Sequence, residues 1–69
     1  MEGLTDREFE VLKLYAKGFS KQEIAWKLLI RRKTVDSHIQ HIREKLCVHK
    51  IYHAIFYALK NGIMSLEDL

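Results

Sequence analysis

The segment 32–46 limits the folds open to this chain more than any other feature of the sequence. In a helix, Val35, Ile39, Ile42 and Leu46 fall within about 60° of arc at 100° per residue. The opposite side of that helix carries polar and charged side chains. This pattern is typical of a helix that packs one side on a small core and exposes the other. We therefore predict an amphipathic helix over 32–46.

Two capping boxes mark where the preceding helices begin. Thr5 stands three residues before Glu8, and Ser20 stands three residues before Glu23. In this pattern the hydroxyl and the carboxylate each accept a hydrogen bond from a backbone N–H that the helix leaves free. The pattern predicts helices that start at about residues 6 and 21.

Glycines mark two of the helix ends. Gly18 and Gly62 suit the position after a helix, where the backbone turns left-handed, and the chain contains no proline. The sequence therefore predicts an all-α, compact four-helix domain with a frayed tail from residue 65. The predicted helices span about 6–17, 21–28, 32–46 and 50–61.

The size of the chain predicts a single domain. Its 69 residues allow one domain over 1–69, with a core at about 4–63. The one cysteine, Cys47, excludes an internal disulfide and a cysteine-based zinc site, so the core alone must stabilise the fold. We expect a cytoplasmic protein, because signal-peptide and membrane-spanning patterns are absent from the sequence. A cofactor or a metal is not expected.

Positive charge is concentrated in the middle of the chain. The formal net charge is only +3, but residues 27–50 hold seven Lys or Arg against two Asp or Glu, a local charge of +5. Such a block suits a surface that binds a polyanion. A solvated charged face with no partner is the alternative at this point.

The short gap between the second and third segments predicts a helix-turn-helix. In that motif the second helix enters the DNA major groove, and its N-terminal half reaches the base edges. Gln40 suits adenine, Asp36 can accept a hydrogen bond from cytosine, and Ser37 can pair with several bases. The helix begins in a basic cluster, Arg31, Arg32 and Lys33, where its free N–H groups also attract phosphate. His41 faces outward and is a further candidate for phosphate.

The fourth segment carries more apolar surface than a domain of this size can cover. Apolar and aromatic side chains lie all round it, which indicates a contact with a second copy. The predicted dimer contacts are Ile51, Tyr52, Ile55 and Phe56.

The spaced residues of the whole chain resemble a known family. The matching positions include Leu4-Thr5-x-Arg7-Glu8, Ala16-x-Gly18-x-Ser20-x-x-Glu23-Ile24-Ala25, Lys33-Thr34-Val35-x-x-His38, Lys45-Leu46-x-Val48 and Gly62-Ile63. Over about residues 4–63 the chain resembles the LuxR/FixJ/GerE type of DNA-binding domain, found at the C-terminus of many bacterial transcription regulators.

The resemblance implies a four-helix domain that binds double-stranded DNA as a homodimer through its fourth helix. Such a protein would be a regulator of the response-regulator type that acts at the nucleoid and contacts RNA polymerase. Base contacts are implied at Asp36, Ser37 and Gln40. The predicted phosphate contacts include the basic cluster and the outward-facing residues. They are Ser20, Lys21, Arg31, Arg32, Lys33, Thr34, His41 and Lys45.

The chain departs from the family pattern at several positions. Asp36 stands where relatives often have lysine, and Arg31 stands where they have a capping serine. We expect Arg31 to exchange helix stability for affinity to DNA. Leu29 and Cys47 replace glycines, so we expect both to adopt a left-handed backbone.

Two other functions remain open at this point. One is a region-4-like domain of a sigma factor, and the other is a protein-interaction module that keeps the fold and uses the fourth helix or Trp26. Catalysis is not expected: Asp36, Ser37 and His38 are consecutive, and consecutive helical residues point in different directions.

Overall fold

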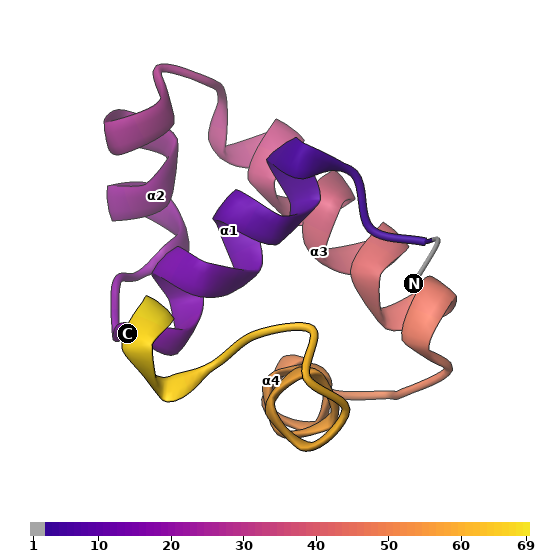
Figure 1. Cartoon of the computed structure of the whole chain (residues 1–69). Helices are drawn as coiled ribbons and strands as arrows, with labels where there is room; N and C mark the ends of the chain where they lie inside the picture. Colours follow the sequence, from indigo (N-terminus) through magenta and orange to yellow (C-terminus); the bar gives the residue numbers. More distant parts are fainter. Residues whose placement is uncertain (1–2) are drawn as a thin grey trace.

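The computed structural model describes residues 3–69, and residues 1 and 2 of the predicted domain lie outside this range. Four helices form a bundle around one core, α1 (Asp6–Ala16), α2 (Lys21–Leu28), α3 (Arg32–Leu46) and α4 (Ile51–Lys60) (Figure 1). A short 3₁₀ turn, η1 (Leu66–Asp68), follows. The predicted all-α class is confirmed, and each helix ends within one residue of its expected bounds.

Both predicted capping boxes are present. Thr5 Oγ1 accepts from Glu8 N at 3.1 Å, and Ser20 Oγ accepts from Glu23 N at 3.1 Å. In return, Glu8 Oε1 accepts from Thr5 N at 3.0 Å and Glu23 Oε1 accepts from Ser20 N at 2.8 Å. These bonds fix where α1 and α2 begin, because they satisfy N–H groups that the helix cannot.

Two non-glycine residues end α2 and α3 in the left-handed region. Leu29 and Cys47 both have φ 57°, as their positions predict. Beyond each of them the chain folds back, with Ile30 N donating to Ala25 O and Val48 N donating to Arg43 O. This backbone costs a side chain about 1–2 kcal/mol, but it closes each helix within one residue. The tight closure after α2 lets α3 start only three residues later.

The apolar stripe of α3 forms the centre of the core. Val35, Ile39, Ile42 and Leu46 are all buried, and α1, α2 and α4 each pack against α3. The other buried hydrophobic residues are Val11, Leu12, Ile24, Ala25, Ile51, Ala54, Ala58 and Met64. α3 is therefore held from three sides while its polar face stays free.

The structure corrects two expectations about the C-terminal part. Ile51, expected at a dimer contact, is buried in the core, because the first turn of α4 packs inward. The tail from residue 65, expected to fray, forms η1, where Ser65 N donates to Asp68 Oδ2 at 2.8 Å. Met64, which the sequence did not indicate, anchors this segment in the core.

A buried carboxylate joins α1 to α3. Glu8 is only 4% exposed, and its Oε1 accepts from Lys45 Nζ at 2.7 Å. His41 Nδ1 lies 3.9 Å from Oε2 of the same carboxylate. Burial raises the pKa of Glu8, but the hydrogen bonds from Lys45 and from the Thr5 backbone outweigh it and leave the pKa below its usual value. The carboxylate is thus stabilised in its charged form.

This pKa shift predicts how stability depends on pH. A lowered folded-state pKa gives stability that is complete above the unfolded-state value, 4.5, and is lost as pH falls through the folded-state value. We expect Glu8→Gln to lower the free energy of unfolding at pH 7 by about 1–2 kcal/mol, because it removes a charged hydrogen bond. The deficit should shrink as the pH falls below the unfolded-state pKa, as measured by urea unfolding at several pH values.

Glu10→Gln is the matched control for that variant. Glu10 lies on the same helix, but its side chain is half exposed and its ion pair within residues 3–69 is with Arg7, at 3.4 Å. Its loss should change the free energy of unfolding little at any pH, since exposed ion pairs contribute little. A Glu8→Gln deficit that stayed constant from pH 7 to pH 3 would contradict the assigned role of the carboxylate.

Candidate nucleic-acid interface

The outer face of α3 is the polar surface that the fold leaves uncovered. α2 and α3 form a helix-turn-helix, and α3 presents Asp36, Ser37 and Gln40 on its exposed side. Gln40 Nε2 donates to Glu44 Oε2 at 3.2 Å, which orients the amide along the helix. The three predicted base-reading residues therefore lie together on one accessible helix.

Asp36 connects the two helices of the motif. Its Oδ1 lies 3.5 Å from Lys21 Nζ of α2 and 3.6 Å from Arg32 Nε of α3. One carboxylate thus holds two cations that the sequence assigns to phosphate. All three side chains are partly exposed, so another anion can compete with Asp36 for these cations.

The beginning of α3 has no side-chain cap. Arg31 occupies the N-cap position without a capping hydrogen bond, and the first turn of α3 holds no acidic residue. The N–H groups at a helix start have no partner within the helix and favour anions. Arg31, Arg32 and Lys33 are exposed beside them, and Thr34 is half-buried. This end of α3 offers backbone donors and positive charge at one place.

The remaining residues predicted to contact phosphate differ in whether their polar groups are already bound within the protein. Ser20 Oγ accepts the capping bond but keeps its own O–H for another acceptor. Lys45 is bound to Glu8, so its ammonium joins α3 to α1 and is less available to another anion. His41 is more exposed and lies at the edge of the same link.

The exposed apolar side chains lie at three places: on α4, at the end of α2, and in the C-terminal segment, where Leu66 and Leu69 are exposed. On α4, Tyr52 is 66% and Phe56 is 65% exposed, whereas Ile55 is half-buried. On α2, Trp26 is 67% exposed, and Leu29 just after it is 91% exposed. The predicted dimer surface is therefore reduced to Tyr52 and Phe56 with Ile55 at its edge.

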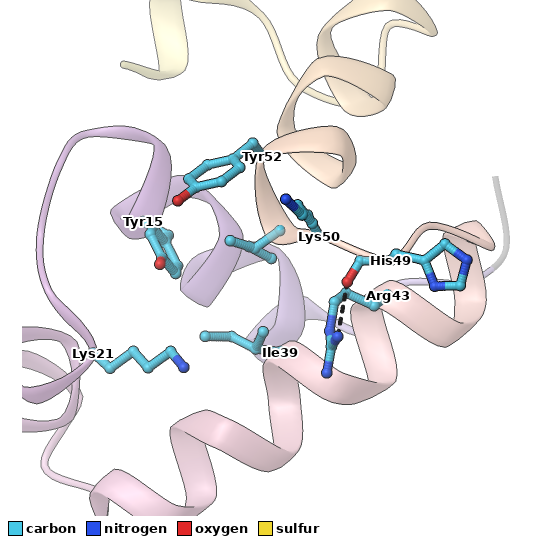
Figure 2. A pocket seen from close by; sticks show the side chains of 8 residues that line it. Tyr15, Lys21, Ile39, Arg43, His49, Lys50 and Tyr52 are labelled. Atoms are coloured by element: carbon cyan, nitrogen blue, oxygen red, sulfur yellow. Dashed lines mark hydrogen bonds between the residues drawn. The ribbon is translucent and has the colours of Figure 1, made fainter.

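A basic cluster that was not predicted from the sequence lies beside the turn between α3 and α4. Arg43, His49 and Lys50 line a pocket there together with Lys21 (Figure 2). Their signal in the sequence is weak, because the pocket needs the turn at Cys47 to bring Lys50 back towards α3. Within residues 3–69, no helix is long and apolar enough to span a membrane.

Comparison with known proteins agrees with this architecture. The family model of bacterial regulatory proteins, luxR family, matches residues 2–58. The response regulator protein VraR of Staphylococcus aureus and that of Staphylococcus saprophyticus are each 44% identical over 64 residues, which cover 93% of this chain and 31% of theirs.

A solved structure gives the same result. The response regulator ChrA of a heme-sensing two-component system is 34% identical and superposes with a TM-score of 0.85, covering 93% of this chain and 32% of that one. The chain thus spans about a third of the length of these relatives. By its helix-turn-helix fold and by its match over most of its length, the chain belongs to the luxR family of bacterial regulatory proteins.

Proposed function

We propose that this chain binds double-stranded DNA in a sequence-specific manner as part of a bacterial transcription regulator, with α3 in the major groove. Family membership supports DNA binding and regulation of transcription. The observation that carries the proposal is the exposed polar face of α3 beside an uncapped, basic helix start. This arrangement favours DNA over a protein partner, since only a polyanion needs that basic end. The match to the luxR family model, in turn, argues against a sigma-factor role.

Base recognition is assigned to the exposed face of α3. Ser37 and Gln40 offer hydrogen-bond donors and acceptors that suit base edges. Asp36 can accept a hydrogen bond from the amino group of cytosine or of adenine in this groove, and it would repel phosphates. Its ion pairs with Lys21 and Arg32 reduce that repulsion. We propose that Asp36 both selects sequence and holds these two cations in place.

Affinity is assigned to the residues around α3. The donors proposed for phosphate are Ser20 and Lys21 at the start of α2, Arg31, Arg32, Lys33 and Thr34 at the start of α3, and His41 on its outer side. Lys45 takes a lesser part because Glu8 holds it. Contacts of this kind position the protein without reading sequence.

A dimer through α4 would place two recognition helices on one two-fold site. Tyr52 and Phe56 supply exposed aromatic surface on one helix. Half-sites about one helical turn apart follow for dimeric helix-turn-helix proteins. Since relatives named response regulators are about three times as long, we propose that this domain is the output part of such a regulator, acting in the cytoplasm with RNA polymerase as a further partner.

Base and phosphate contacts can be separated by two substitutions on α3. Gln40→Ala should weaken binding to the selected operator by about 1–3 kcal/mol and relax preference at one base position. Lys33→Ala should weaken all duplexes alike and reduce the salt slope by about one. Operator selection from a random pool, followed by fluorescence anisotropy on operator and scrambled duplexes, measures both effects.

The two variants serve as controls for each other, because both lie on the exposed side of the same helix. If Gln40→Ala weakened operator and scrambled DNA equally, Gln40 would be a phosphate contact. If neither variant changed binding, α3 would not be the recognition helix.

The dimer surface is tested by Phe56→Glu. A charge at this exposed position should raise the dimer dissociation constant at least tenfold, because it opposes burial of the aromatic surface, and should leave the melting temperature nearly unchanged. Trp26→Glu is the matched control, since Trp26 is equally exposed but lies on α2. Sedimentation equilibrium distinguishes them, and equal dimer affinity in both variants would remove α4 from the interface.

A further inference from the structure

A basic pocket lies beside the exposed face of α3, where the ends of α1 and α3 meet the start of α4 (Figure 2). Its volume is about 330 Å³, and none of the described residues that line it is acidic. In Figure 2, Lys21 reaches in from one side and Arg43 and Lys50 from the other. The polar lining consists of Lys21, Arg43, His49, Lys50 and the two tyrosines Tyr15 and Tyr52.

Arg43 is held in place at this pocket. Its Nη1 donates to His49 O at 2.8 Å, which ties α3 to the turn before α4. Its Nε is buried and has no hydrogen-bond partner among the residues that the structure describes. The bond through Nη1 holds the guanidinium at the lining of the pocket, where it adds a fixed positive charge.

The start of α4 adds backbone donors to the same place. Lys50 is the N-cap of α4 and makes no side-chain cap, and the first turn holds no acidic residue. The first N–H groups that bond within the helix belong to His53 and Ala54, so those of Ile51 and Tyr52 precede the ladder. Both residues line the pocket. α1 and α2, in contrast, begin with complete capping boxes.

We propose that this pocket binds a phosphate group. Side chains from α1, α2, α3 and α4 surround it, which suits a tetrahedral anion with several acceptor oxygens. Two ligands share this chemistry: a phosphodiester of bound DNA and a free phosphate. Binding of the first rests on the proposed function and binding of the second does not.

The position of the pocket favours the phosphodiester. Lys21 lines it and also lies 3.5 Å from Asp36 on the base-reading side of α3. Arg43 follows Gln40 by three residues, so the two are neighbours on α3. A backbone phosphate in this pocket would fix the start of α4 against the DNA and set the depth of α3 in the groove.

Titration with inorganic phosphate tests the site without DNA. In ¹H–¹⁵N correlation spectra at constant ionic strength, we expect saturable shifts of the Ile51 and Tyr52 amides in the wild type. Lys50→Ala should weaken this binding at least threefold, whereas Lys60→Ala, at the opposite end of α4, should not. Shifts spread evenly over all exposed basic residues would indicate non-specific screening and overturn the site.

Duplex binding distinguishes the source. If the pocket holds a phosphodiester, Lys50→Ala reduces the salt slope of duplex binding by about one relative to Lys60→Ala. If duplex binding is unchanged while phosphate shifts are lost, the pocket serves a free phosphate. Unchanged results in both experiments would refute the proposal, and a wild type that binds phosphate but no duplex would refute the proposed function alone.

Discussion

The contact between the Glu8 carboxylate and Lys45 is the interaction on which the arrangement of this molecule depends. Glu8 completes the cap of α1 and at the same time binds a lysine 37 residues away on α3. Because the carboxylate is buried, its charge must remain paired. The start of α1 is therefore fixed against α3, and the apolar stripe of α3 is pressed into the core with its polar face outward.

Local signals explain how much of this fold the sequence could predict. The boxes at Thr5 and Ser20 and the stripe from Val35 to Leu46 involve residues within a turn or two of one another, so their geometry follows from helix periodicity. The left-handed ends at Leu29 and Cys47 followed from the family pattern. Burial of Ile51 and Met64 could not be predicted, because it depends on how α4 and the tail pack against other helices.

In the candidate site, too, features within one helix could be predicted from the sequence, whereas contacts between helices could not. Exposure of Asp36, Ser37 and Gln40 follows from their side of one helix. The ion pairs of Asp36 with Lys21 and of Lys45 with Glu8 join separate helices, so they depend on tertiary packing and could not be predicted from the sequence. These pairs change the chemistry, because two cations lie beside the charge of Asp36 and the ammonium of Lys45 is already bound to Glu8. α1 and α2 begin with capping boxes. α3 and α4 begin without a side-chain cap, so their first N–H groups are free beside basic side chains.

The central claim is that the exposed side of α3 binds DNA through its basic surroundings. Its most direct test is fluorescence anisotropy of a labelled random-sequence duplex, titrated with the chain at several salt concentrations. We expect affinity that falls steeply with salt, with a log–log slope of about −0.9 for each phosphate contacted. Absence of binding at low salt, or binding independent of salt, would contradict it.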